Sequence, residues 1–109
     1  MTEDTPEDDY EDVIEEYYKG EKIHSLITLK VDTKEVDNIA CALTDMDAVN
    51  DIYLVTGDTD IVLNAVFQDY KEFKEFIVDE VGALKGIRET KTLMIVTIYK
   101  KSGVKIDAD

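Results

Sequence analysis

The sequence predicts an α+β fold in which strands and helices follow one another in the order β-α-β-β-α-β. Three observations predict it. Alternating and helical spacings of apolar residues succeed one another in that order along the chain. An aspartate followed three residues later by a glutamate precedes each helical segment, as in a capping box. The stretch TGDTD, residues 56–60, separates two apolar runs and is typical of a hairpin turn.

The first strand and helix occupy residues 23–43. Residues 23–31 alternate between polar and apolar side chains and read as a strand. The helix is expected to begin at Asp32 or Thr33, with Glu35 completing the capping box. Its predicted buried stripe is made of Val36, Ile39, Ala40 and Leu43.

The second and third strands are predicted at residues 49–55 and 60–67, with TGDTD as the hairpin between them. Asp69 is the expected N-cap of the second helix, with Glu72 three residues later. The apolar face of this helix is predicted to contain Tyr70, Phe73, Phe76, Ile77, Val81 and Leu84.

Gly86 is expected to end the second helix. A final strand is predicted over residues 90–100, and Val104 and Ile106 are candidates for a short additional edge. Right-handed crossovers then place both helices on one face of a four-stranded antiparallel, ferredoxin-like sheet.

The opposite sheet face is predicted to carry apolar residues as well. In the third strand, Val62 and Val66 point away from the side that carries Ile61, Leu63, Ala65 and Phe67. An exposed apolar sheet would favour aggregation, so we expect two chains to pack sheet on sheet, as in a dimeric α+β barrel.

Composition narrows the classes of function. A chain of 109 residues with a net charge of −14 lacks the basic face that DNA, RNA or an anionic membrane surface requires. No run is long and apolar enough to span a membrane, and the acidic N-terminus does not read as a signal peptide. The single cysteine, Cys41, cannot form an internal disulfide, which favours the cytoplasm.

The charge also divides the chain into three parts. Residues 1–22 hold ten acidic and two basic residues and form an acidic arm, with a short amphipathic helix expected over residues 10–19. Residues 23–100 form the globular domain, and residues 101–109 a polar tail. The arm reads as a solubility tail or, alternatively, as a DNA mimic for a basic partner.

No catalytic or metal-binding cluster emerges from the sequence. His24 is the only histidine, and Cys41 is expected to be a small buried hydrophobe rather than a redox group. Acylphosphatase-type enzymes share this topology but use an arginine after the first strand, where residues 31–34 offer none. The sequence therefore predicts neither a cofactor nor an enzyme.

Asp58 and Asp60 are not required simply to form a hairpin turn, so each needs a separate explanation. Either aspartate can hydrogen-bond the turn backbone, which is the structural interpretation. Alternatively, backbone N–H groups could bind a carboxylate while an aspartate binds an ammonium group, so that the turn holds a zwitterion.

The residues around this turn resemble the effector domain of the Lrp/AsnC family, also called the RAM (regulation of amino acid metabolism) domain. Residues 49–63 resemble its central hairpin, and residues 35–43 its first helix. Phe73-x-x-Phe76-Ile77 and the segment Lys85-Gly86-Ile87-Arg88-Glu89-Thr90-Lys91-Thr92 resemble its second helix and the approach to its last strand. The entry to the second strand lacks the family's proline, and the resemblance covers about residues 23–100.

The resemblance implies dimers through apposed sheets, higher rings of dimers, and small effectors, usually amino acids, at contacts between dimers. The matching positions for effector binding are Gly57, Asp58 and Asp60, with Thr90 and Thr92 as further candidates.

Family regulators usually carry an N-terminal helix-turn-helix, and the 22 residues before the first strand, ten of them acidic, do not provide one. We therefore expect a stand-alone effector domain that acts through protein contacts, with full-length relatives as candidate partners. Two alternatives remain: an enzyme on a dimeric α+β barrel, for which Asn64 is the conspicuous polar residue, and a structural partner that binds no small molecule.

Overall fold

The computed structural model describes residues 22–106, so the helix predicted over residues 10–19 lies outside the described residues. The strands are β1 (Ile23–Val31), β2 (Val49–Leu54), β3 (Ile61–Phe67), β4 (Ile87–Met94), β5 (Lys100–Lys101) and β6 (Val104–Lys105). The helical segments are a 3-10 turn η1 (Thr33–Glu35), α2 (Val36–Thr44), α3 (Tyr70–Glu75) and a π-helical continuation η2 (Phe76–Val81).

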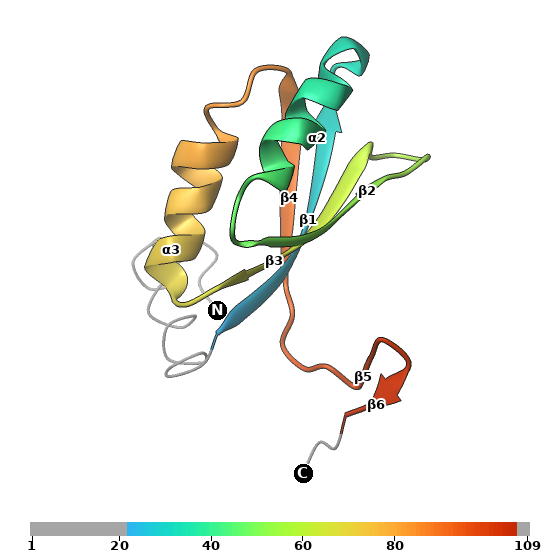
Figure 1. Cartoon of the computed structure of the whole chain (residues 1–109), viewed down its shortest axis with the longest axis vertical. Helices are drawn as coiled ribbons and strands as arrows, with labels where there is room; N and C mark the ends of the chain where they lie inside the picture. The colour runs from blue at the N-terminus through green and yellow to red at the C-terminus, as the bar shows by residue number, and fades with distance from the viewer. Residues whose placement is uncertain (1–21, 107–109) are drawn as a thin grey trace, which may run out of the picture.

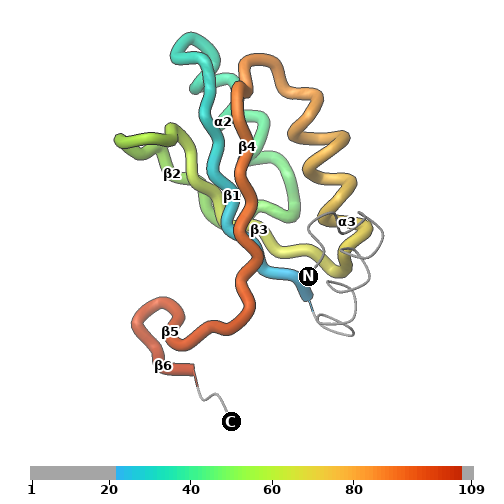
Figure 2. The backbone as a smooth tube through the Cα atoms, turned by 180° about the vertical axis from the view of Figure 1, so that it is seen from behind, coloured from blue at the N-terminus to red at the C-terminus, as the bar shows by residue number. Residues whose placement is uncertain are grey.

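β1 to β4 form one antiparallel sheet in the order β2-β3-β1-β4, which is the predicted ferredoxin-like topology. Both helices lie in front of this sheet in Figure 1, and Figure 2 shows the same sheet from behind, with the helices beyond it. The prediction of two helices on one face of a four-stranded sheet is confirmed.

The core lies between the sheet and the helices because β1 and β3 place every second side chain there. Phe67 packs against the rings of Phe73 and Phe76, with ring centroids 5.4 and 5.2 Å apart. The buried apolar residues are Ile23, Ile27, Leu29, Val31, Ile39, Leu43, Ile61, Leu63, Ala65, Phe67, Phe73, Phe76 and Val81. Both predicted helical stripes supply members of this core.

Capping chemistry begins the second helix but not the first. The carboxylate of Asp69 accepts the backbone N–H of Glu72 at 2.8 Å, as the sequence predicts. Asp32 makes no capping bond, because its carboxylate instead accepts a hydrogen bond from the guanidinium of Arg88. The chain therefore enters α2 through the 3-10 turn η1.

Three predicted boundaries are wrong. The last strand begins at Ile87 rather than at residue 90, because Ile87 already pairs with Val31 of β1. The second helix ends at Val81 rather than at Gly86, since its last turn widens to a π turn in which Gly82 N–H bonds the carbonyl of Ile77. The strand predicted to reach residue 100 stops at Met94, because its partner β1 begins at Ile23 and the last ladder contact is Ile95 N–H to His24 carbonyl.

Beyond that point the chain forms a separate hairpin, β5–β6, which extends away from the sheet (Figure 1). Val104 belongs to this hairpin rather than to an edge of the main sheet. The sequence predicts that Cys41 is buried, and this prediction is wrong. Cys41 is exposed on α2, because only Ile39 and Leu43 of this helix are buried against the sheet.

The face of the sheet opposite the helices, termed the open face, is crossed by rows of paired residues. One row runs from Asp51 through Asn64 and Leu26 to Leu93. The next row consists of Tyr53, Val62, Thr28 and Lys91. Tyr53 is 56% exposed and Leu93 58% exposed, so the open face presents large apolar side chains without cover from the described residues.

Candidate functional site

The loop between β2 and β3 joins two paired strands, as predicted for TGDTD. Val55 N–H donates to the carbonyl of Asp60 at 2.9 Å, which closes the loop over the four residues between them. Asp60 N–H and the Thr59 hydroxyl both donate to the carbonyl of Leu29, at 3.0 and 2.9 Å. The loop is therefore hydrogen-bonded to the C-terminal end of β1 rather than free in solvent.

Asp60 has a structural role in this fastening. Its Oδ2 accepts the backbone N–H of Val31 at 2.9 Å, at the point where the register of β1 against β4 shifts. Val31 is buried, so the carboxylate satisfies a donor that water could reach only with difficulty. This bond supports the structural interpretation for Asp60 and leaves the second oxygen for another partner.

Gly57 and Asp58 form the exposed tip. Gly57 has φ of 129°, a conformation that favours glycine, and nothing lies within 4 Å of where a Cβ would stand. The main-chain carbonyl of Asp58 accepts a bond from Lys30 Nζ at 3.1 Å. Among residues 22–106 no group donates to the Asp58 carboxylate, which leaves it open to a ligand.

Thr90 and Thr92 lie apart from the tip. Thr90 pairs with Leu29 and Thr92 with Ile27, whose side chains are buried on the helix side of the sheet. The two threonines share that side, along the edge strand β4. The structure therefore brings Gly57, Asp58 and Asp60 together in one loop and does not bring the threonines to them.

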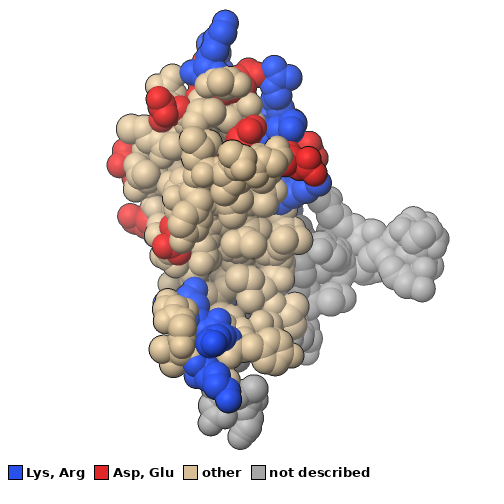
Figure 3. Space-filling model, turned by 90° about the vertical axis from the view of Figure 1, so that its right-hand side faces the viewer, with Lys and Arg blue, Asp and Glu red and all other residues tan. Residues whose placement is uncertain are grey.

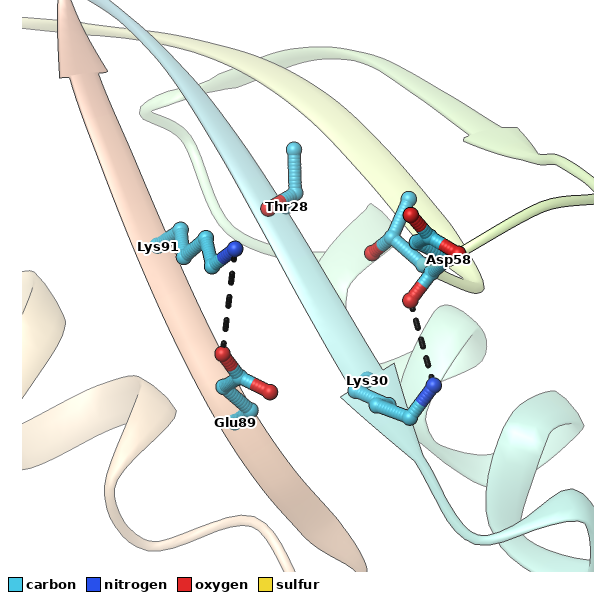
Figure 4. Close-up of a pocket in the computed structure, with 6 residues that line it drawn as sticks. Thr28, Lys30, Asp58, Glu89 and Lys91 are labelled. Atoms are coloured by element: carbon cyan, nitrogen blue, oxygen red, sulfur yellow. Dashed lines mark hydrogen bonds and ion pairs between the residues drawn. The ribbon is translucent and has the colours of Figure 1, made fainter.

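A shallow hollow of about 60 Å³ adjoins the loop tip (Figure 4). Three segments contribute to it: β1, β4 and the loop itself. Its lining residues are Thr28, Lys30, Asp58, Thr59, Glu89 and Lys91. Because Thr28 pairs with Lys91 and Lys30 with Glu89, these strand residues stand side by side on the open face.

The hollow contains equal numbers of positive and negative side chains, and the ion pair between two of them is weak. Lys30 and Lys91 supply two ammonium groups, and Asp58 and Glu89 two carboxylates. Lys91 Nζ lies 3.9 Å from Glu89 Oε2, with the two side chains 73% and 54% exposed. An exposed pair of this kind contributes less than about 1 kcal/mol, so a ligand that offers a carboxylate and an ammonium group could replace it at little cost.

Sequence reasoning found Asp58 but missed Lys30, Glu89 and Lys91. Alternation alone puts Thr28 and Lys30 on one face of β1, and Glu89 and Lys91 on one face of β4. The pairing register of β1 and β4 brings the two pairs together. That register joins residues far apart in the sequence, so local patterns do not reveal it.

Residues 22–106 offer neither a metal-binding cluster nor a membrane-spanning helix. That part of the chain holds no group of three or more His, Cys, Asp or Glu side chains placed to bind a metal. None of its helices is long and apolar enough to cross a membrane. Asn64, one of the polar residues of the open face, donates to Asp51 Oδ2 at 3.4 Å.

Comparison with known proteins decides the family. The family model described as the Lrp/AsnC ligand binding domain matches residues 24–104, which include β1 except for Ile23, β2 to β4, the loop tip and the hollow. The chain belongs to the Lrp/AsnC ligand-binding domain family. The resemblance read from the sequence is thereby confirmed.

Curated relatives of this Lrp/AsnC domain are helix-turn-helix regulators from archaea. An uncharacterized HTH-type transcriptional regulator, PF1231 of Pyrococcus furiosus, is 26% identical over 88 residues, which are 81% of this chain and 60% of that protein. HTH-type transcriptional regulator FL11 of the same organism is 26% identical over 76% of this chain and 54% of that protein. The chain thus spans little more than half the length of these relatives.

Solved structures show the same fold. The transcriptional regulator NMB0573 of Neisseria meningitidis, solved as a complex with L-Met, matches with a TM-score of 0.70 and 19% identity over 75% of this chain and 55% of that chain. TTHA0845 of Thermus thermophilus matches with a TM-score of 0.68 and 23% identity over 72% of this chain and 99% of that chain. FFRP-DM1 matches with a TM-score of 0.65 and 19% identity over 67% of this chain and 97% of that chain.

The last two matches cover almost the whole of the solved chains, so the Lrp/AsnC fold occurs in chains that consist of little else. The family comprises ligand-binding domains of transcriptional regulators, which are not enzymes. The prediction that this chain is not an enzyme is confirmed at the level of the family.

Proposed function

We propose that this Lrp/AsnC domain binds an amino acid at the hollow beside the loop tip and that it assembles through its open face. The observation that carries the proposal is the balanced set of two ammonium groups and two carboxylates in that hollow, within a domain whose family binds effectors. An α-amino acid is a zwitterion and can satisfy both signs at once.

A binding geometry follows from the strand register. Lys30 and Lys91 would hold the carboxylate of the effector, and Asp58 with Glu89 would hold its ammonium group. The hollow has room for little more than this charged end of the molecule. The effector's side chain would then project over the open face, where a second copy could enclose it and exclude water.

The open face supports assembly because it exposes Tyr53 and Leu93 beside half-buried Leu26 and Val62. Apposing two such faces removes these side chains from water and gives the dimer that the sequence predicts. As the family resemblance implies, we expect such dimers to join into larger assemblies.

We further propose that the domain acts on transcription in the cytoplasm through contacts with helix-turn-helix regulators of its family. Two observations support this: the curated relatives are such regulators, and the net charge of −14 disfavours direct contact with DNA.

Thermal unfolding in the presence of each proteinogenic amino acid tests the binding step. A true effector should stabilise the protein by about 2.7 kcal/mol at a hundredfold excess over Kd. Asp58→Asn and Lys91→Ala should each remove most of that effect. Matched control variants are Asp79→Asn and Lys85→Ala, which change exposed residues outside the hollow.

Failure of all twenty amino acids to stabilise the protein would reject the sensing function and favour a structural partner that binds no ligand. Mixing the purified domain with a full-length Lrp/AsnC regulator tests the protein contact. A mixed oligomer in native mass spectrometry is expected, and separate homo-oligomers would contradict it.

A further inference from the structure

The β5–β6 hairpin is a basic and apolar element in an acidic protein. Lys100, Lys101 and Lys105 lie on it, and residues 95–106 contain no aspartate or glutamate. Tyr99 is 74% exposed and Val104 63% exposed. Figure 3 shows a group of basic side chains at the lower end of the molecule, apart from the basic side chains at its upper end.

A groove elsewhere in the fold has the opposite charge and a similar apolar character. It has a volume of about 360 Å³ and lies between the loop that follows α2 and the α3–η2 helix. Its apolar lining consists of Met46, Ala48, Phe67 and Phe76, and its charged lining of Asp45, Asp47, Glu72 and Glu80. We term it the acidic groove.

All four charged residues of the acidic groove are acidic, and three of them have no hydrogen-bond donor within residues 22–106. The carboxylate of Glu72 accepts the backbone N–H of Gln68 at 2.6 Å. Within residues 22–106 no group donates to the carboxylates of Asp45, Asp47 and Glu80. An occupant with ammonium groups and an apolar surface would fit these features best.

Within one chain the hairpin and the acidic groove belong to opposite edges of the sheet. The hairpin follows the edge strand β4, and the groove includes residues 45–48, which lead into the other edge strand, β2. Figures 1 and 2 show the hairpin apart from α3 in both views. Both elements nevertheless lie at the same end of the sheet, where Ser25 pairs with Met94 and Val49 with Ala65.

In a dimer, the hairpin of one copy can reach the acidic groove of the other copy. When two open faces meet about a two-fold axis parallel to the strands, β4 of one copy lies over β2 of the other and the strand ends remain level. Stacked sheets are about 10 Å apart. The five residues 95–99 can extend about 17 Å, which is enough for the hairpin to reach around the edge of the partner's sheet.

We propose that the β5–β6 hairpin of each copy docks in the acidic groove of the other copy. This inference rests on the apposed-sheet dimer of the proposed function but not on ligand binding. It gives the three lysines carboxylate partners and covers Tyr99 and Val104. It also offsets part of the repulsion between two chains that each carry a charge of −14.

Disulfide trapping in the full chain tests the contact. In a Cys41→Ser background, Val104→Cys on the hairpin is combined with Ala48→Cys in the acidic groove. The matched control combines Val104→Cys with Val78→Cys, an exposed position on η2 outside the groove. Mild oxidation should give covalent dimers with the first pair at least about fivefold more often than with the control.

Sedimentation equilibrium on the reduced proteins separates the possible failures. A dimer without preferential cross-linking overturns the hairpin contact alone, as does a cross-link within one chain. A monomer at all concentrations overturns the dimer and the contact together. Covalent dimers specific to the first pair support the proposal.

Charge reversal gives an independent measurement. Lys100→Glu with Lys105→Glu should raise the dissociation constant of the dimer about tenfold at low salt, and added salt should lessen this increase because it screens the new repulsion. Adding Asp45→Lys and Asp47→Lys to that variant should restore most of the affinity, whereas an unchanged dissociation constant in the first variant would overturn the proposal.

Discussion

Removing the hydrogen bond from Val31 N–H to Asp60 Oδ2 tests whether this bond attaches the β2–β3 loop to β1. Asp60→Ala removes the acceptor and leaves a donor on a residue that is only 5% exposed. The variant should unfold more readily than the parent in the absence of ligand, because no other described group takes over the bond.

The magnitude follows from the geometry. A hydrogen bond to a charged group contributes about 1.5–3 kcal/mol to stability, and the partial exposure of the Asp60 side chain lowers this to about 1–2 kcal/mol. For a domain of this size, each kcal/mol shifts Tm by roughly 4–8 °C. Asp60→Asn, which keeps a carbonyl acceptor, should lose about half as much.

Urea titration at a fixed protein concentration is the assay, since self-association contributes to the apparent stability. Asp58→Ala is the matched control. It removes the same group two residues away, where the carboxylate accepts no hydrogen bond from the described residues, and should change stability by less than about 0.5 kcal/mol. Equal stability of Asp60→Ala and Asp58→Ala would refute the fastening role of Asp60.

Three further outcomes are expected. Gly86→Ala should lower the free energy of unfolding by roughly 1–3 kcal/mol in urea, because φ is 98° and a Cβ would stand 2.7 Å from Cβ of Glu35; an unchanged midpoint would contradict this. Leu93→Glu should weaken self-association at least about tenfold in sedimentation velocity, because it places a charge on the open face, and parental affinity would argue against apposed sheets. Cys41→Ser should leave Tm within about 3 °C, because the thiol is exposed, whereas a larger fall would indicate that assembly buries it.

Much of the fold was predictable because local signals agree with the tertiary arrangement. Alternation in residues 23–31 and 61–67 gives the two central strands within one residue, and the Asp69 cap marks the start of α3. These elements carry the core, so burial follows from the periodicity of their apolar residues.

Boundaries that depend on distant partners were predicted less well. The apolar run after Met94 has strand character, yet β4 ends there because β1 offers no further backbone to pair with. Asp32 and Glu35 have the spacing of a capping box, but Arg88, 56 residues away, binds Asp32 instead. Neither the end of the partner strand β1 nor the bond from Arg88 can be recognised in the local sequence.

In the candidate site, too, local sequence predicted some features and long-range pairing decided others. The sequence by itself determined the family, the topology and the loop that carries Gly57, Asp58 and Asp60, because each rests on short-range spacing of residues. Only the tertiary structure decided that Asp60 braces β1 and that Lys30, Lys91 and Glu89 stand beside Asp58. The reason is physical: antiparallel register joins residues about 60 positions apart, and the free energy that fixes it is distributed over the whole sheet.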